Sequence, residues 1–154
     1  MNTFWQRLKE RFINIYPPLL GAGIRSFPID ERTIRVEMKL TQSNRNIVGV
    51  HFGGSLYAMC DPWFMLILMR ELPDYIVWDK AASIKFLRPG RSKVTAVFHI
   101  PRERVDEIRL AADREEKVEP LFTVDVLDEE GLVVAHVEKL LYVRKKNIRP
   151  AVLK

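Results

Sequence analysis

The clearest pattern along the chain is a strict alternation of apolar and polar residues between positions 33 and 40. Apolar side chains stand at every even position of this segment, as expected for a β-strand with one buried face. Looser versions of the pattern predict four more strands, at residues 75–87, 93–100, 121–127 and 132–143. Because short turn sequences join these strands in pairs, we expect antiparallel hairpins.

Three segments show the spacing or composition of helices instead. Residues 3–16 begin with the capping box Thr3-Phe4-Trp5-Gln6 and repeat apolar residues at helical spacing, which predicts an amphipathic helix that ends at Pro17. Residues 101–116 open with a proline at the first helical position and continue with strong helix formers. Residues 56–72 are so apolar that we expect a helix buried on every side.

Together these elements predict one α+β domain, in which a five-stranded antiparallel sheet wraps around a long apolar central helix. The core covers residues 33–143, an N-terminal helix at residues 1–17 packs on it, and residues 144–154 form a solvated basic tail. A sheet wrapped around a single helix usually needs a partner subunit. We therefore expect a homodimer or a dimer of dimers.

Composition narrows the kinds of site that the chain can hold. Cys60 is the only cysteine, which excludes an intramolecular disulfide and a metal site built from cysteines alone. His99 and His136 lie on predicted strands without the spacing of metal ligands, so we expect no metal and no cofactor. The single cysteine and the charged, interrupted start of the chain favour a cytoplasmic protein over a secreted one.

The chain carries 25 basic and 20 acidic residues, a formal net charge of +5. This charge favours an anionic partner, although an ordinary solvated basic surface would look the same. The basic residues are dispersed and no nucleic-acid motif accompanies them, so coenzyme A fits better than nucleic acid. Asp61 and Pro62 interrupt the most apolar segment, which argues against a membrane span.

Asp61 is the only strongly ionising side chain between His51 and Arg70. Burying an unpaired carboxylate costs several kcal/mol, so Asp61 must be hydrogen-bonded, protonated or facing a site. In a site it would be a candidate general base. The alternative is structural, because an aspartate followed by Pro62 is also a good helix start.

Gly53, Gly54 and Ser55 provide another helix start, one or two turns earlier. Free N–H groups at that start would form an oxyanion hole, and Asp61 would then lie on the same helix face as Gly54. His51 is either an acid–base group or a structural hydrogen-bonding residue. We expect the thiol beside Asp61 to be inert core.

From about residue 34 to residue 143 the chain resembles the hot-dog superfamily, and within it the branch of phenylacetate-pathway-type acyl-CoA thioesterases. The likeness rests on an asparagine, a His-Gly-Gly-type segment, an aspartate in an apolar helix, and a strand that ends in an aromatic residue and then proline. In this chain they are Asn46, His51-Phe52-Gly53-Gly54, Asp61, Phe86 and Pro89. The segment most closely resembles that of an uncharacterised hot-dog branch.

The resemblance implies that Asp61 activates water, that the Gly53 amide polarises the thioester carbonyl and that Asn46 positions the water. Phe52 stands where the family histidine belongs, which leaves the role of His51 open. The resemblance also implies dimers in which the strand around residues 78–83 enters the neighbouring site.

The side chains expected to contact substrate are Phe52, Ser55, Asp79 and Ser83. For Asp79, the alternative to a contact with substrate is a structural ion pair with Lys80. The leading hypothesis is a thioesterase-like enzyme that hydrolyses an acyl-CoA or related thioester, with Asp61 as general base or nucleophile. The second hypothesis is a non-catalytic acyl-CoA or lipid-binding module.

Overall fold

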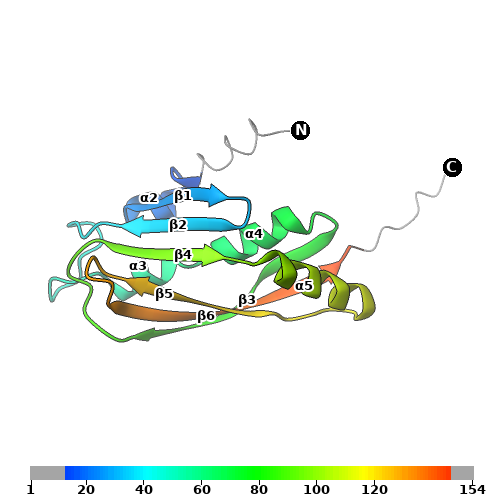
Figure 1. The fold of residues 1–154 in the computed structure, drawn as a ribbon. Coiled ribbons are helices and arrows are strands. Elements are labelled where there is room, and N and C mark those ends of the chain that lie inside the picture. Colours follow the sequence, from blue (N-terminus) through cyan, green and yellow to red (C-terminus); the bar gives the residue numbers. More distant parts are fainter. Residues whose placement is uncertain (1–12, 147–154) are drawn as a thin grey trace.

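Six strands form one antiparallel sheet in the order β1-β2-β4-β5-β6-β3, and helices α3 and α4 lie against one of its faces (Figure 1). The computed structural model describes residues 13–146. In chain order the elements are α2 (Pro17–Gly21), β1 (Ile24–Asp30), β2 (Thr33–Met38), α3 (Gly53–Ala58), α4 (Trp63–Glu71), β3 (Tyr75–Phe86), β4 (Val94–His99), α5 (Arg102–Arg114), β5 (Leu121–Leu127) and β6 (Val133–Lys145). The α+β class expected from the sequence is confirmed.

Strand β1 makes the sheet six-stranded, so the predicted count of five strands is wrong. Within β1 only Ile24 and Ser26 are buried, and Pro28 lies inside the strand, just before a shift in register. An edge strand has a neighbour on one side only, so it tolerates a proline and needs no alternating apolar pattern. This is why the sequence pattern does not reveal it.

The five predicted strands are present with small differences at their ends. Strand β6 continues to Lys145 and so takes in the first residues of the predicted basic tail. Most of the predicted N-terminal helix, residues 1–12, lies outside the described residues, as does the segment 147–154. The prolines expected to end that helix instead begin the short helix α2, since proline fits the first turn of a helix.

The long central helix of the prediction is two helices. Helix α3 begins at Gly53, at the earlier of the two helix starts that the sequence offers, and ends at Ala58. Residues 59–62 form turns and bends, and α4 follows from Trp63. Because Pro62 has no N–H to donate, a break at this point is expected.

The core lies between α4 and the sheet and is rich in aromatic rings. Phe64 meets Phe98 of β4 edge-on at 5.1 Å between ring centroids and stacks on Phe122 of β5 at 4.9 Å. Trp63 is almost completely buried, and its indole N–H donates to the Met59 carbonyl at 2.6 Å. These contacts fix α4, and with it the break before α4, against the sheet.

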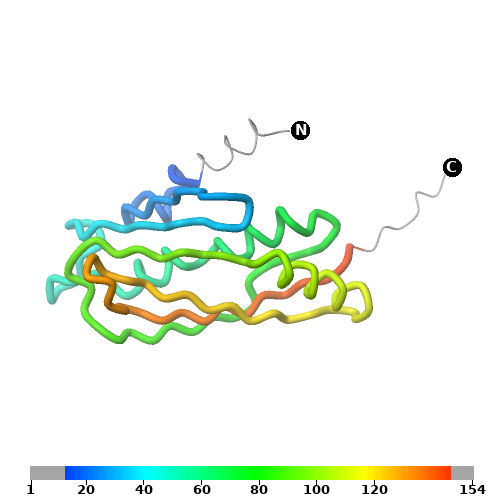
Figure 2. Tube along the Cα trace, viewed as in Figure 1, coloured from blue at the N-terminus to red at the C-terminus, as the bar shows by residue number. Residues whose placement is uncertain are grey.

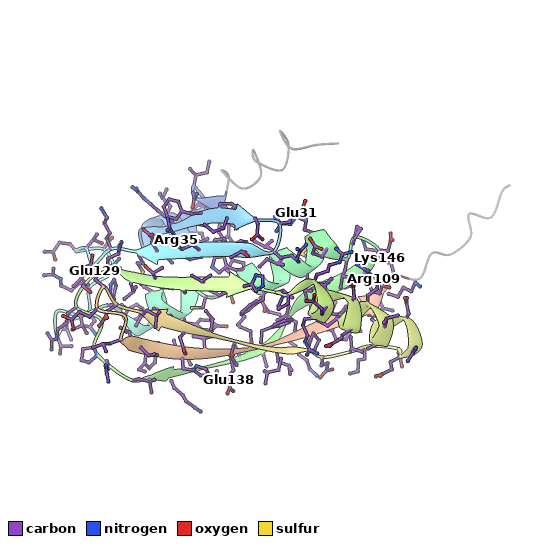
Figure 3. All side chains as sticks on the ribbon, in the orientation of Figure 1. Glu31, Arg35, Arg109, Glu129, Glu138 and Lys146 are labelled. Atoms are coloured by element: carbon purple, nitrogen blue, oxygen red, sulfur yellow. The ribbon has the colours of Figure 1, made fainter. Side chains whose placement is uncertain are left out.

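Strand β3 forms the second edge of the sheet and pairs only with β6 (Figure 2). A bulge between Asp79 and Ala81 shifts the register of this pair. The edge strand exposes about half of the Trp78 side chain and half of Phe86. Charged side chains such as Arg35 of β2 and Glu138 of β6 cover the outer surface (Figure 3).

None of the helices in the described part of the chain is long and apolar enough to cross a membrane.

Candidate functional site

Asp61 lies in the break between α3 and α4, where the chain is not helical. It does not cap α4, because Pro62 is the N-cap residue of that helix and no side chain caps it. Asp61 is therefore not an N-cap residue, although α4 does begin directly after Asp61 and Pro62. Its side chain is about half exposed, 51%. The break also means that Asp61 and Gly54 do not share one helix face, contrary to expectation.

The main partner of Asp61 is Lys139 of β6, a residue that the sequence reasoning missed. Lys139 is completely buried, and its Nζ donates to Asp61 Oδ1 at 2.8 Å. The same Nζ lies 3.2 Å from Oδ1 of Asp79 in β3. The Tyr57 hydroxyl donates to Asp61 Oδ1 at 3.4 Å, and Lys139 Nζ lies 5.5 Å from the centre of the Tyr57 ring.

A signal for Lys139 does exist in the sequence. The inward-facing residues of β6 on either side of it, Val137 and Leu141, are apolar and fully buried. A lysine in such a row must have a compensating charge nearby. The ion pair of Asp79 with Lys80, the alternative role for Asp79, is absent, because Lys80 pairs with Glu119 at 2.7 Å.

The electrostatics of this cluster follow from burial and charge pairing. Burial alone would lower the pKa of Lys139, but the carboxylates of Asp61 and Asp79 outweigh it, so the pKa rises and the ammonium persists. Burial raises the pKa of Asp79, and Lys139 opposes that shift only in part. Burial also raises the pKa of the Cys60 thiol to about 12, consistent with the expected inert core residue.

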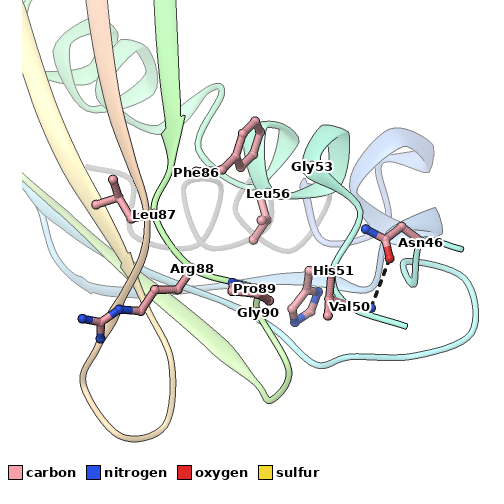
Figure 4. A pocket seen from close by; sticks show the side chains of 10 residues that line it. All are labelled: Asn46, Val50, His51, Gly53, Leu56, Phe86, Leu87, Arg88, Pro89 and Gly90. Carbon is pink, nitrogen blue, oxygen red and sulfur yellow. Dashed lines mark hydrogen bonds between the residues drawn. The ribbon is translucent and has the colours of Figure 1, made fainter. Parts of the chain in front are cut away.

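A cleft of about 410 Å³ opens at the start of α3, at the far end of β3 from Asp79 (Figure 4). Three of the predicted catalytic residues line it, together with Phe86 at the end of β3 and the loop that follows. The lining residues are Asn46, Val50, His51, Gly53, Leu56, Phe86, Leu87, Arg88, Pro89 and Gly90. Asp61 and Asp79 are not among them.

His51 is buried in the wall of this cleft. Its Nε2–H donates to the Ser92 carbonyl at 2.9 Å, since a carbonyl oxygen can only accept. Its Nδ1 is buried and has no hydrogen-bond partner among the described residues. Burial lowers the pKa of His51, and the Ser92 carbonyl only partly opposes this. The imidazole is therefore neutral, with an unshared acceptor atom.

Asn46 organises the loop that leads to His51. Its Oδ1 accepts the N–H groups of Val48 and Val50, both at 3.1 Å. Figure 4 shows the bond from Val50. These bonds leave Ile47 completely exposed and Val48 largely exposed at the loop tip. The amide oxygen of Asn46 thus already has a structural use.

The two glycines at the start of α3 make room for aromatic rings. A Cβ on Gly53 would lie 3.0 Å from the Phe86 ring, and one on Gly54 would lie 2.4 Å from the Phe52 ring. Phe52 is the N-cap residue of α3 and is half exposed. A bound molecule that displaces either ring would reach the backbone at the start of α3.

The remaining predicted residues, Ser55 and Ser83, lie outside both the cleft and the cluster around Lys139. Ser55 is buried within α3. Ser83 donates to Glu138 at 3.2 Å and is exposed. Within one chain, the structure therefore brings together Asn46, His51 and Gly53 in the cleft, and Asp61 with Asp79 at Lys139. No group of three or more metal-ligating side chains occurs among residues 13–146.

Comparisons with known proteins agree with this fold. A family model described as a domain of unknown function, DUF4442, matches residues 6–143. No curated protein matches the sequence.

Solved structures similar to the chain include a Pseudomonas aeruginosa protein of unknown function described as a "Probable Thioesterase". It is 20% identical, with a TM-score of 0.82 over 92% of this chain and 96% of the other. A thioesterase of Haemophilus influenzae is 20% identical, with a TM-score of 0.65 over 87% of each chain. The PaaI protein of the phenylacetic acid degradation operon of E. coli is 19% identical, with a TM-score of 0.62 over 92% of each chain.

These neighbours are thioesterase-like proteins with the hot-dog fold, which confirms the resemblance found in the sequence. At this level of identity they establish the fold of the chain and leave its substrate open. The chain belongs to the DUF4442 family.

Proposed function

We propose that this protein hydrolyses an acyl thioester, such as an acyl-CoA, with Asp61 as the general base or nucleophile. The observation that carries the proposal is the state of the Asp61 carboxylate. Lys139 and Tyr57 hold Oδ1, whereas Oδ2 has no hydrogen bond within the described part of the chain. A carboxylate that is fixed on one oxygen and open on the other is suited to attack a carbonyl carbon or to take a proton from water.

The cleft at the start of α3 supports a thioester as the substrate. Its wall combines apolar side chains with the neutral imidazole of His51, whose free Nδ1 can accept a hydrogen bond. Arg88 lines the rim of the cleft. Arg45 and Arg91 are exposed, and each is adjacent in sequence to a residue that lines the cleft. Guanidinium groups at a rim would attract the phosphates of coenzyme A or of a carrier-bound pantetheine. The Gly53 amide is the candidate donor to the thioester carbonyl.

The site needs a second copy of the chain to become complete. Asp79 and Phe86 are seven residues apart on β3, roughly 23 Å at about 3.3 Å per residue. If the free edges of two β3 strands pair antiparallel, the Asp79 end of one strand meets the Phe86 end of the other. The Asp61 cluster of one protomer then faces the cleft of its partner, so the proposed enzyme is a homodimer.

The direct test is thiol release from a panel of acyl-CoA substrates. We expect turnover by the wild type and its loss in Asp61→Asn, with fold and dimer intact. Asp74→Asn is the matched control, because Asp74 is exposed and outside both groups of site residues. Full activity in Asp61→Asn would refute the role of Asp61. Binding of acyl-CoA without turnover by the wild type would favour the alternative, a non-catalytic binding module.

Mixing two inactive variants tests whether the site is shared. Asp61→Asn damages the carboxylate, and Gly53→Val fills the cleft of the same chain, since a Cβ there already touches Phe86. In a shared arrangement each mixed dimer keeps one intact site, so re-assorted mixtures regain about one quarter of wild-type activity. If both residues act within one chain, the mixture stays inactive.

A further inference from the structure

We propose that Lys139 is a positioning residue of the proposed hydrolysis: it holds Asp61 in its reactive orientation, and Asp79 serves as the standing counter-ion of the ammonium. This inference rests on the proposed function. It concerns a residue outside the sequence motif, one that the resemblance does not touch.

Stability does not explain a lysine at this position. Its neighbours in the inward row of β6 are valine and leucine, and Lys139 itself is fully buried. Moving an ammonium out of water costs several kcal/mol, which ion pairing only roughly offsets, so an apolar residue of similar volume would serve the fold equally well. The buried charge calls for a reason other than folding.

The geometry supplies that reason. Asp61 lies in a non-helical break and is half exposed, so its own backbone does little to fix its side chain. Lys139 projects from the middle of the longest strand, and its Nζ contacts Asp61 Oδ1 at 2.8 Å. The contact selects one rotamer of Asp61 and leaves Oδ2 as the free oxygen. A 1 Å misplacement of a reacting group costs about 10²-fold in rate.

The edge strand is shaped to bring a second carboxylate to the same ammonium. The bulge after Asp79 shifts the register, so that Lys139 stands opposite the small residue Ala82. Asp79 Oδ1 then lies 3.2 Å from Nζ. A bulge that re-aims one side chain is a common device next to active sites.

Lys139 benefits from a second carboxylate because Asp61 loses its negative charge during hydrolysis, whether it acts as a base or as a nucleophile. As a base, Asp61 takes a proton from water while the water oxygen bonds to the carbonyl carbon. The C–S bond then breaks, its electron pair stays on sulfur, and the thiolate takes up the proton. As a nucleophile, Asp61 forms an anhydride and releases the thiolate, and water then cleaves the anhydride. In both cases Asp79 still balances Lys139, so no buried cation is left unpaired.

The test compares Lys139→Met with Leu141→Met, a substitution at the next inward position of the same strand. We expect Lys139→Met to lower kcat about 10²-fold with KM changed less than about twofold. The acid limb of its kcat/KM profile moves to higher pH, because the ammonium that opposes the rise in the pKa of Asp79 is gone. Lys139→Arg restores part of kcat. Leu141→Met changes thermal stability alone and keeps the wild-type pH profile.

The outcomes separate this inference from the proposed function. No wild-type turnover with any thioester would overturn both. Wild-type turnover that depends on Asp61, together with a Lys139→Met enzyme that matches Leu141→Met in kcat and pH profile, would overturn the role of Lys139 alone. If Lys139→Met fails to fold, the test uses Lys139→Arg and Asp79→Asn instead. Both variants must lower kcat by a larger factor than they change KM. Unchanged kcat in both variants refutes the inference.

Discussion

Cys60 allows a quantitative prediction, because it lies next to Asp61 and could be mistaken for a nucleophile. The thiol is completely buried, and burial raises its pKa from 9.0 to about 12. At pH 8 a thiol of pKa 9 is roughly one-tenth thiolate, whereas one of pKa 12 is roughly one ten-thousandth thiolate. Since only the thiolate attacks a disulfide reagent, we expect native Cys60 to react about 1000-fold more slowly than an exposed cysteine, before any steric protection.

The assay follows Ellman's reagent at pH 8 with native protein and with protein unfolded in guanidinium. The unfolded chain should release one equivalent of the coloured thiolate within the mixing time of a hand experiment. The native protein should release it about 1000-fold more slowly. Cys60→Ala should retain thioester turnover. A fast stoichiometric reaction of the native protein, or loss of turnover in Cys60→Ala, would refute the assignment of this thiol to the inert core.

Three further predictions concern the core and the cleft. Phe98→Ala should lower the free energy of unfolding by about 3–5 kcal/mol in a urea titration. Phe27→Ala, whose ring lies on the outer face under Arg35, should cost less than about 1 kcal/mol; equal losses would contradict the core assignment. Folding lowers the pKa of His51, so the unfolded chain binds the imidazole proton more tightly and the free energy of unfolding should fall as the pH drops below 6.5. His51→Gln should make this fall with pH less steep. Parallel curves of stability against pH for the two proteins would disprove the role of His51. Gly90→Ala should destabilise by about 1–3 kcal/mol, since a Cβ there lies 2.9 Å from the His51 ring, whereas Gly21→Ala, with open space around it, should be neutral in the same thermal melt.

The fold was largely predictable because its signals are local. Strict alternation marks β2, and the apolar run marks the helices beneath the sheet. The missed strand β1 owes its place to pairing with β2, where Ile24 lies opposite Met38, and no local pattern encodes such a pairing. The break before Trp63 was underestimated because the apolar run continues through it, although Pro62 cannot donate the N–H that a continuous helix needs.

The candidate site was predictable in part, for a similar reason. Asp61 stands out as a lone carboxylate in an apolar segment, and the cleft contains Asn46, His51 and Gly53 as the motif implies. The pairing of Asp61 with Lys139 joins positions 78 residues apart, so only the three-dimensional structure reveals it. Sequence proximity suggested Lys80 for Asp79, whereas the fold supplies Lys139.

Strands β4 and β5 are joined by only two residue pairs, Thr95 with Leu127 and Ala96 with Val126. Three strands lie on each side of this short seam, and α5 connects the two halves where their pairing ends. Opening a sheet costs least where the fewest interstrand hydrogen bonds must break, so the two halves are natural units of partial unfolding. Hydrogen exchange should therefore reach the β4 amides beyond Ala96 before those of the longer β5–β6–β3 ladder.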